Sequence, residues 1–344
     1  MYDLSTYKIK SEPVILGIES SCDETACAVI KGRKILADEI ISSAQEQSKY
    51  GGVVPEIASR AHTDAIDEVV KRALAAADIT PKEVDAVAVT YGAGLLGALL
   101  VGLSFAKSFA YSLNIPLIAV NHSRGHMASA YLEMPDLQPP FITLLASGGH
   151  TAILHTQSYV KAQVLCSTCD DAAGEAFDKV ARVLSLPYPG GPNVQKKAQQ
   201  GSACIAFPSA LVKNSGDDRF SYSGLKTAVI NYCHTAQQKG IEVNHADVAA
   251  SFQRAAIEPL VKKTVEYAVR LNIGTVTAGG GVIANDYLRE RLKDECGKHG
   301  LKLILPPKRY CTDNAAMIAS EGLNKYLAGD FSPLDINAKA ALPL

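Results

Sequence analysis

Hydrophobic and polar positions along the chain follow two periods, one typical of strands and the other typical of helices. Short apolar runs predict buried strands, and apolar residues three and four positions apart predict amphipathic helices. In the first part of the chain the expected strands are 14–19, 25–30, 34–40, 84–90 and 116–121. A long amphipathic helix is expected over 55–77, and the apolar run Gly94–Ala106 predicts a buried helix after a glycine turn. Strands and helices that alternate in this way predict an α/β fold.

The pattern starts again after a proline-rich segment at 134–140, where we expect a boundary between two lobes. A strand, a turn of small residues and a second strand open both halves, which favours one α/β unit used twice. The expected elements of the second half are strands at 141–146, 151–155 and 303–305, helices at 172–184, 223–237 and 246–271, a strand–turn–helix at 275–291, and a closing helix at 314–327. The expected domains are an N-terminal lobe over 13–135 that a C-terminal helix at about 311–330 completes, a second lobe over 140–310, and flanking tails at 1–12 and 331–344.

Composition and charge narrow the functional classes. The 344 residues are 47% hydrophobic and 20% charged, close to average soluble usage, and the net charge is −1. This charge provides no general attraction to nucleic acid or membrane, so an RNA partner requires a local basic patch or another subunit. The run Gly94–Ala106 is too short to span a bilayer, and we find no secretory signal. We therefore expect a cytoplasmic protein that does not act at a membrane.

The cysteines fit a reducing compartment. Eight of them in a chain of this length do not form a disulfide scaffold. Cys166 and Cys169 form a CxxC, but the chain contains no second CxxC that would complete a zinc site. We interpret these two cysteines as incidental.

Three polar or glycine-rich turns follow expected strands, at 20–25, 147–151 and 278–281. Glycine lets backbone N–H groups approach an anion, as in phosphate-binding loops, although glycines also serve plain tight turns. Three such turns, each at the end of a strand in an open α/β sheet, favour a nucleotide in a cleft between the lobes.

Acidic residues cluster at the start of the helix expected over 172–184. Capping of that helix explains Asp170 or Asp171, because carboxylates favour the positive end of a helix. Asp178 lies a turn or more inside the helix, where capping does not explain it. We expect its carboxylate to accept hydrogen bonds from ribose hydroxyls beside the turn Gly190–Pro192.

His122 and His126 are four residues apart, so both imidazoles face the same side of a helix. The pair is either a set of metal ligands or ordinary helix residues, and Ser123 stands where a metalloprotease has its glutamate. Asp313 is the candidate for a third ligand, with helix N-capping as the alternative interpretation. Two histidines and one carboxylate suit Fe²⁺ with open positions for substrate, and Zn²⁺ is the runner-up.

A series of sequence blocks in a fixed order carries a resemblance that covers about Val14 to Leu327. The blocks are ILGIESSCDETACAVI, YGGVVPEIASRAH, NHSRGHMASA, LLASGGHT, DDAAGEAFDKVARVLSLPYPGGP, FSYSGLKTA, AGGGVIAN and CTDNAAMIA. With these blocks the chain resembles the universal tRNA N6-adenosine threonylcarbamoyltransferase family, whose members were once described as O-sialoglycoprotein endopeptidases. The resemblance implies the two-lobed actin/Hsp70/sugar-kinase-like (ASKHA) fold, with a nucleotide cleft between duplicated lobes.

The resemblance also assigns site residues. His122, His126 and Asp313 match the family's metal ligands, which implies one divalent metal ion per subunit. The positions that match the family's substrate-binding residues are Leu145, Ala146, Ser147, Gly148 and Gly149 in the loop that contacts threonylcarbamoyl-adenylate, and Asp178, Gly191 and Asn285 around the nucleotide. Gln195 departs from an aspartate that some members have near the ribose. No residue is assigned as a general base.

The implied activity is transfer of an L-threonylcarbamoyl group from threonylcarbamoyl-AMP to N6 of adenosine 37, with release of AMP, in tRNAs that read codons beginning with adenine. Bacterial members work with a catalytically inactive paralogue and a small ATPase. The small residues Ala58, Ala61, Ala65 and Ala73 make the helix at 55–77 a candidate docking face, unless they pack on the chain's own sheet. Lys308–Arg309 and Arg124 form either a basic rim for RNA or a solvated surface.

Three rival functions belong to other classes. A non-catalytic nucleotide-binding paralogue or scaffold of the same complex would have no use for the His122, His126 and Asp313 set. A peptidase would need a glutamate between the histidines, and a sugar kinase of this fold needs no histidine pair.

Overall fold

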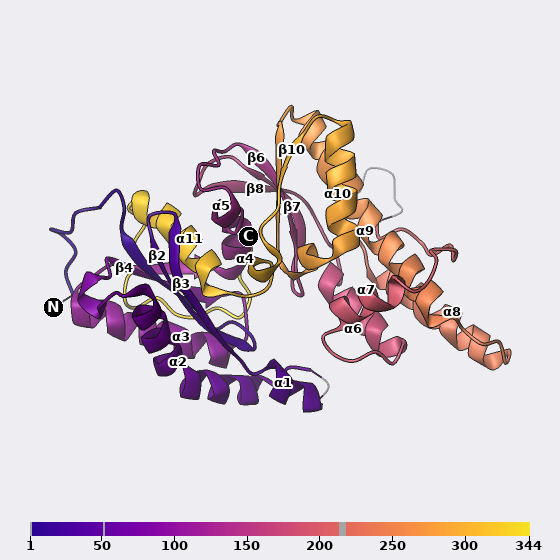
Figure 1. Cartoon of the computed structure of the whole chain (residues 1–344), viewed down its shortest axis with the longest axis horizontal. Helices are drawn as coiled ribbons and strands as arrows, with labels where there is room; N and C mark the ends of the chain where they lie inside the picture. Colours follow the sequence, from indigo (N-terminus) through magenta and orange to yellow (C-terminus); the bar gives the residue numbers. More distant parts are fainter. Residues whose placement is uncertain (1, 51, 213–217) are drawn as a thin grey trace. The chain divides into compact units, whose positions relative to one another are not determined.

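The computed structural model describes residues 2–50, 52–212 and 218–344. The chain divides into two compact units (Figure 1). Unit 1 comprises Met1–Leu137 and Thr312–Leu344, and unit 2 comprises Gln138–Cys311.

Unit 1 is built on a five-stranded sheet in the order β3-β2-β1-β4-β5. The strands are β1 (Val14–Glu19), β2 (Glu24–Lys31), β3 (Lys34–Ser42), β4 (Ala86–Gly92) and β5 (Leu117–Asn121). The first three are antiparallel neighbours, whereas β4 and β5 run parallel to β1. All six residues of β1 are buried, as the continuous apolar run predicts for a strand covered on both faces.

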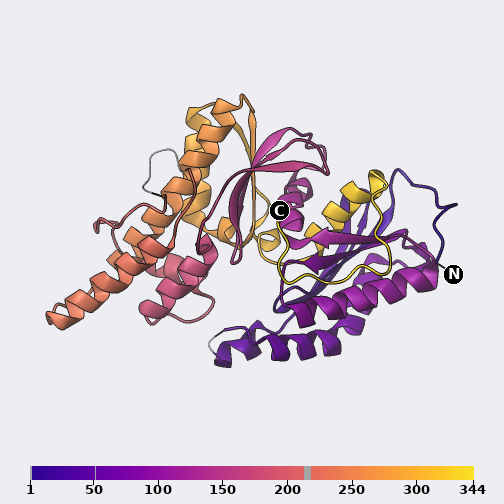
Figure 2. The same ribbon diagram turned by 180° about the vertical axis from the view of Figure 1, so that it is seen from behind.

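Helices cover both faces of this sheet (Figures 1 and 2). On one face, α2 (Pro55–Ala77) and α3 (Leu96–Leu113) bury Val69 and Leu103 in one core with Leu16 of β1. On the other face, α11 (Ala315–Leu327) packs Ile318 into a second core with Ile15. Because α11 lies so close to β1, a Cβ atom at Gly17 would be 2.5 Å from the carbonyl oxygen of Ala315.

Unit 2 repeats this plan. Its five-stranded sheet has the order β10-β9-β6-β7-β8, so β8, β7 and β6 are antiparallel neighbours, and β9 and β10 run parallel to β6. The strands are β6 (Phe141–Ala146), β7 (Thr151–Thr156), β8 (Ala162–Ser167), β9 (Thr275–Gly279) and β10 (Lys302–Ile304). The helices are α6 (Ala173–Val183), α7 (Gly190–Ala198), α8 (Ser223–Gln238), α9 (His245–Arg270) and α10 (Asp286–Lys298). The repeated strand order is the one expected from an α/β unit used twice.

Short elements complete the chain. They are α1 (Ala44–Gln47), η1 (Ser48–Tyr50), η2 (Pro81–Glu83), α4 (His122–Ala128), α5 (Ala130–Glu133), η3 (Gly281–Ala284) and η4 (Lys308–Tyr310). The pattern of apolar residues did not predict β8 or α7. Three of the six residues of β8 are only half-buried and two are exposed, so its apolar signal is weak.

The apolar helix α3 extends further than expected, over Leu96–Leu113. In the described part of the chain it is the one helix whose length and composition would allow it to cross a membrane. The apolar residues of α3 have a role within unit 1, because Leu103, Ala106 and Ala110 are buried in the core against the first sheet.

The terminal segments, expected to be flanking tails, pack on unit 1. The Tyr7 hydroxyl donates to the Asp85 carbonyl oxygen at 2.7 Å. At the other end, Leu334 and Ile336 contact the core formed with α2 and α3. The backbone N–H of Gly94 donates to the carbonyl oxygen of Ala340 at 3.0 Å, so the C-terminal segment also touches the glycine turn before α3.

Candidate functional site

The two histidines lie on one face of α4, which begins directly after β5. Asn121 caps this helix, because its side-chain oxygen accepts from the backbone N–H groups of Ser123, at 2.9 Å, and Arg124, at 3.4 Å. The ring centroids of the His122 and His126 imidazoles are 4.7 Å apart. His126 is fully buried, and the His122 side chain is 12% exposed.

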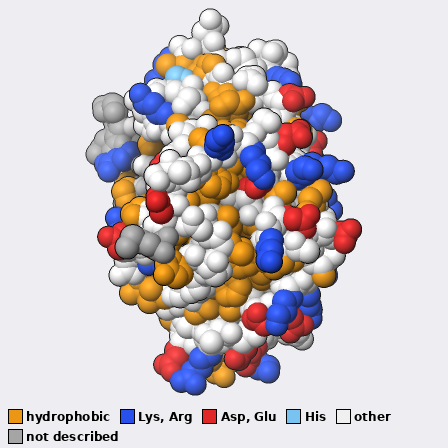
Figure 3. All heavy atoms as spheres, turned by 90° about the vertical axis from the view of Figure 1, so that its left-hand side faces the viewer, with side chains coloured by type: hydrophobic (Ala, Val, Ile, Leu, Met, Phe, Trp, Pro, Cys, Tyr) orange, Lys and Arg blue, Asp and Glu red, His pale blue; other side chains and the backbone are white. Residues whose placement is uncertain are grey.

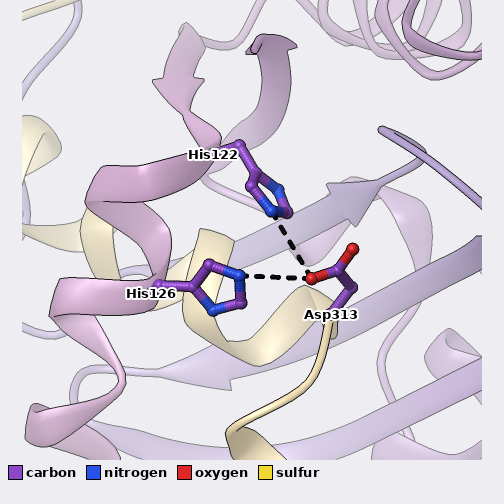
Figure 4. Close-up of side chains that lie close together, drawn as sticks. All are labelled: His122, His126 and Asp313. Atoms are coloured by element: carbon purple, nitrogen blue, oxygen red, sulfur yellow. Dashed lines mark ion pairs between the residues drawn. The ribbon is translucent and has the colours of Figure 1, made fainter. Parts of the chain in front are cut away.

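Asp313 lies just before α11 and points toward both histidines (Figure 4). Its Oδ1 atom is 3.4 Å from Nε2 of His122 and 3.2 Å from Nε2 of His126. The capping interpretation of Asp313 is wrong, because Asn314 caps α11 by accepting from the Met317 N–H at 2.9 Å. The Asp313 carboxylate is therefore free to face the histidines.

The spacing of these three side chains suits a metal ion. One potential ligand atom from each lies within 4.8 Å of the others. Ligand atoms bonded to one ion at about 2.0–2.2 Å are about 3 Å from each other, close to the separations between Asp313 and the two histidines. Both imidazoles present Nε2 to the same point, so the donor set fits a divalent ion with two nitrogen ligands and one oxygen ligand.

The electrostatics of the cluster also favour a cation. Burial opposes ionisation of Asp313, but His122 and His126 outweigh it and hold the pKa of the Asp313 carboxyl below its ordinary range. Burial likewise disfavours a charged His122, yet Asp313 and Glu19 raise the pKa of that imidazole well above 6.5. The two carboxylates thus stabilise positive charge between them, which a bound metal ion would supply.

Glu19 is the residue of this cluster that the motif analysis missed. It ends β1, is fully buried, and places Oε2 3.0 Å from Nδ1 of His122. The available signal was a carboxylate at the end of a continuous apolar strand, just before the polar turn at 20–25, because such a charge needs a partner when buried.

That polar turn lies beside the glycine turn before α3. The backbone N–H of Leu95 donates to the Ser21 carbonyl oxygen at 2.8 Å. A Cβ atom on Gly94 would be 2.6 Å from the same oxygen, so glycine is required there for the two turns to meet. Ser21 Oγ is in turn 3.1 Å from Nδ1 of His122. The first of the three predicted turns therefore belongs to the histidine cluster.

The other two glycine turns meet in unit 2. Strand β6 pairs with β9 so that Leu145 lies opposite Gly279, and the turns that follow both strands are neighbours. Gly280 has a φ of 99°, and a Cβ atom there would be 2.4 Å from the Ala146 carbonyl oxygen. Gly148 and Gly149 have no neighbouring atom within 4 Å of a Cβ position, so a ligand can approach their backbone.

Of the five predicted loop residues, Leu145 and Ala146 are buried in β6, and Ser147–Gly149 form the turn. The turn is closed by the Ser147 N–H, which donates to the His150 carbonyl oxygen at 2.8 Å. The Gly174 N–H at the start of α6 donates to the Ser147 carbonyl oxygen at 3.1 Å, which brings α6 next to this turn.

Asp178 contacts the first turn of a helix other than its own. Its Oδ1 accepts from the Gly190 N–H at 2.7 Å, at the first turn of α7. Burial raises the pKa of the Asp178 carboxyl above 3.8, and the N–H groups of Gly190 and Gly191 oppose that rise. Gly191 has open space at its Cβ position. The pair thus places open space beside a half-buried acid.

The two neighbouring acids also differ from expectation, because neither caps α6. Asp170 accepts from the Tyr222 N–H at 2.7 Å at the start of α8, and Asp171 pairs with Lys226 at 2.8 Å. The first backbone N–H of α6, that of Ala173, donates instead to Oγ1 of Thr151 at 2.8 Å.

Asn285 is the cap of α10 and accepts from the Leu288 N–H at 3.1 Å. Its amide nitrogen donates to Gln253 at 2.9 Å. The next residue, Asp286, is held by Gln195, whose amide nitrogen donates to Oδ2 at 3.0 Å and whose oxygen accepts from the Asp286 N–H at 2.8 Å. An aspartate in place of Gln195 would put two carboxylates together here, so glutamine fits its neighbour.

The expected basic rim is largely paired within the chain. Lys308 binds Asp286, and Arg309 lies over the ring of Tyr310 with 4.6 Å between the guanidinium carbon and the ring centroid. Arg124 donates through Nε to the buried Glu321 at 2.8 Å. Lys308 and Arg124 are thus ion-paired within the chain, and Arg309 stacks on a neighbouring ring.

Comparison with known proteins identifies related sequences over nearly the whole chain. The family model described as tRNA N6-adenosine threonylcarbamoyltransferase matches residues 34–320. The protein of that name from Moorella thermoacetica is 51% identical over 339 residues, which cover 98% of this chain and 99% of the relative. The protein of the same name from Clostridium perfringens is 48% identical over 336 residues, covering 97% of this chain and 99% of the relative.

Solved structures of low sequence identity share the fold. Full-length HypF in its phosphate- and nucleotide-bound form has a TM-score of 0.64 at 15% identity, covering 94% of this chain and 48% of HypF. The (R)-2-hydroxyglutaryl-CoA dehydratase component A of Acidaminococcus fermentans has a TM-score of 0.51 at 15% identity, covering 92% of this chain and 99% of that one. With the duplicated sheets, these similarities show the ASKHA-type α/β fold that the sequence blocks implied.

Proposed function

Because the chain belongs to the tRNA N6-adenosine threonylcarbamoyltransferase family, we propose that it transfers an L-threonylcarbamoyl group to N6 of adenosine 37 in tRNAs that read codons beginning with adenine. The donor is threonylcarbamoyl-AMP, and AMP is the leaving group. The observation that carries this proposal is the 51% identity to a named relative over 98% of the chain. The cluster of His122, His126 and Asp313 supports it, because a chain that served only as a nucleotide-binding scaffold would not need that donor set.

We propose that His122, His126 and Asp313 hold one divalent metal ion, Fe²⁺ in preference to Zn²⁺. Two histidines and one carboxylate are the ligand set of Fe²⁺ sites that keep open positions for substrate. When bound, the metal would polarise the donor carbonyl and stabilise the negative charge that develops as the amine attacks. The protein's part is to present both Nε2 atoms and one carboxylate oxygen to a single point.

The adenylate is assigned to the residues that unit 2 brings together. The open backbone at Gly148 and Gly149 offers N–H groups to phosphate and ribose oxygens, and Gly191 leaves open space beside the first turn of α7. Asp178 is a half-buried acceptor next to Gly191. Held in this way, the acyl carbon would stay in place for an incoming amine, which converts a bimolecular reaction into a nearly unimolecular one.

The tRNA has to present its adenosine unstacked, since an exocyclic amine inside a base stack cannot be reached. On the face drawn in Figure 3, basic and acidic side chains are interspersed, and the basic side chains coloured there do not gather into one patch. Together with the net charge of −1, this favours a tRNA-binding surface that other subunits complete. We propose a catalytically inactive paralogue and a small ATPase as those partners, and the cytoplasm as the compartment.

Three of the four small residues in the stripe on α2 pack on the chain's own unit, as the alternative interpretation expects, and the fourth, Ala61, is half-buried. Ala58 and Ala73 are fully buried and Ala65 is 9% exposed, so these residues pack within unit 1. A partner that binds α2 would have to use the opposite, charged face of the helix.

A transfer assay with pre-made threonylcarbamoyl-AMP and unmodified tRNA tests the proposed function. We expect modified adenosine with the wild-type chain and its partner proteins, and loss of most of the bound metal and of the activity with His126→Ala. Full metal occupancy in His126→Ala, measured by elemental analysis, would contradict the metal assignment. Absence of transfer by a metal-loaded wild-type complex would contradict the activity itself.

A further inference from the structure

We propose that Glu19 is a positioning residue that holds the His122 imidazole with Nε2 directed at the metal ion, an inference that rests on the proposed metal centre. The two residues are 103 positions apart in the sequence and meet at the carboxyl end of the first sheet. Glu19 ends β1, and His122 follows the last residue of β5.

The Glu19 carboxylate is held firmly in place. Oε1 accepts from the Ser21 N–H at 2.5 Å, and Oε2 accepts from the Thr90 hydroxyl at 2.6 Å. Both anchors are backbone or short side chains at the ends of β1 and β4, so they leave the carboxylate little freedom to rotate. The same Oε2 atom is 3.0 Å from Nδ1 of His122.

This contact decides which ring nitrogen can bind metal. A carboxylate only accepts hydrogen bonds, so Nδ1 must carry the proton and donate it. The lone pair of the neutral ring is then on Nε2, the atom that faces Asp313 at 3.4 Å. Carboxylates that orient metal-binding histidines in this manner also increase the basicity of the ligand.

Ser21 Oγ, 3.1 Å from the same Nδ1 atom, cannot do this alone. A hydroxyl both donates and accepts, so it would leave either nitrogen protonated. His126 offers a contrast, because its Nδ1 atom is buried and has no hydrogen-bond partner in the described part of the chain. Of the two histidines, only His122 is oriented by a carboxylate.

The hydrogen bonds from Ser21 and Thr90 do not supply the positive charge that the buried Glu19 carboxylate needs. Among the ion pairs of the described residues, Glu19 has a partner only in His122 and none in a lysine or arginine. A buried carboxylate without positive charge nearby is strongly unfavourable. A metal ion bound to the other side of the His122 ring would supply that charge.

The test is the affinity of the purified chain for Zn²⁺ and Co²⁺, measured by competition with a chelator. In Glu19→Gln an amide N–H₂ group takes the place of an acceptor, and it favours a proton on Nε2 instead of Nδ1. We expect 10- to 100-fold weaker binding of both ions, the range found when such outer partners are removed. A Kd within about twofold of wild type would overturn the proposal.

Asp85→Asn is the matched control. Asp85 is also a carboxylate with 9% exposure in unit 1, but it accepts from the Val14 N–H at the opposite end of β1. Its substitution should leave the metal Kd unchanged, although it lowers stability. An equal loss of affinity in Asp85→Asn would show that Glu19 acts only through general stability, and would overturn the positioning role.

A measurement on the unmodified chain keeps the proposal testable if Glu19→Gln does not fold. Heteronuclear NMR of the zinc-loaded protein should show His122 bound through Nε2, with a proton retained on Nδ1. Binding through Nδ1 would refute the inference. Failure of the wild-type chain to bind either ion would refute the metal centre itself. Equal metal affinity in Glu19→Gln and wild type would refute only the role of Glu19.

Discussion

At the scale of single residues, the glycines of unit 2 have two separate roles. A Cβ atom on Gly190 would be 2.6 Å from the Cα atom of Asp178, so this glycine permits close packing of α7 on α6. Gly191, the next residue, faces open space. A glycine whose side-chain position is empty is not needed for packing, and the room it leaves suits a ligand that contacts the backbone.

We therefore expect Gly191→Val to weaken adenylate binding at least about tenfold while unit 2 keeps its fold, because the new side chain occupies the space above the first turn of α7. Calorimetric titration with a non-hydrolysable threonylcarbamoyl-adenylate analogue measures the effect. Gly224→Val is the control, since Gly224 is also the second residue of a helix with no neighbour within 4 Å of its Cβ position. Unchanged affinity in Gly191→Val would remove α7 from the nucleotide site.

His62 is a second residue whose environment has a measurable consequence. It is 1% exposed on α2, with Nδ1 2.7 Å from the Thr25 hydroxyl and Nε2 3.0 Å from the Cys22 carbonyl oxygen. Burial lowers the pKa of the His62 imidazole below 6.5, against the opposing effect of Cys22. Protons therefore bind the unfolded state more readily than the folded state, and the free energy of unfolding falls as the pH drops below about 6.5.

In His62→Gln the free energy of unfolding should fall less as the pH decreases than it does in the wild type. The measurement is the difference in the free energy of unfolding between about pH 7.5 and pH 5.5, on either side of the ordinary histidine pKa. His299→Gln, which replaces a histidine with a 45% exposed side chain, should behave as wild type. An identical pH dependence in His62→Gln and wild type would show that His62 is not the group responsible.

At the scale of elements, an ion pair joins α4, which carries the two histidines, to α11, which follows Asp313. Arg124 lies between the histidines on α4, and Glu321 lies two turns after Asp313, on α11, with 2.8 Å between Nε and Oε1. The side chains are only 17% and 5% exposed. Burial raises the pKa of the Glu321 carboxyl, and Arg124 opposes that rise. The pair thus stabilises the packing of α4 against α11.

Arg124→Ala should lower the free energy of unfolding by about 3 kcal/mol, because it leaves a buried carboxylate without its partner. Denaturant titration measures this change. Arg60→Ala provides the comparison, since Arg60 and Glu56 form a pair on α2 with 77% and 78% exposed side chains, and a loss below about 1 kcal/mol is expected there. The double variant Arg124→Ala/Glu321→Gln should recover part of the lost stability. Equal losses of stability in Arg124→Ala and Arg60→Ala would show that the buried ion pair contributes no more than the exposed one.

At the scale of the whole molecule, charge is the property that bears on partners. The chain has a net charge of −1, and two of the three residues of its candidate basic rim, Lys308 and Arg124, are paired with Asp286 and Glu321. Binding of a polyanion depends on the number of phosphates that free lysine and arginine side chains can neutralise. A tRNA-binding surface made by this chain alone is therefore expected to be weak.

We expect the isolated chain to transfer the threonylcarbamoyl group at least about tenfold more slowly than the chain with its partner proteins, because the partners would add the missing phosphate contacts. Single-turnover transfer with pre-made threonylcarbamoyl-AMP compares the two. Adding salt should slow the partnered reaction, since phosphate contacts release counterions. Equal rates with and without partners would contradict this prediction.

The amino-acid sequence by itself determined the alternation of strands and helices, the two similar halves and the ligand candidates. Each of these depends on local information. Buried positions recur every second residue in a strand and every third or fourth residue in a helix. The two histidines lie about one helical turn apart. Weak elements such as β8 escaped prediction because only one of its side chains is buried.

Only the tertiary structure decided which side chains serve each site. Asn314 caps α11 and releases Asp313, Asp178 accepts from the first turn of α7 across a loop, and Glu19 reaches His122 over 103 residues. A polar side chain suits several roles equally well from its sequence position alone. The role it takes depends on which N–H group, imidazole or carboxylate the packing of distant strands and helices places within hydrogen-bonding distance.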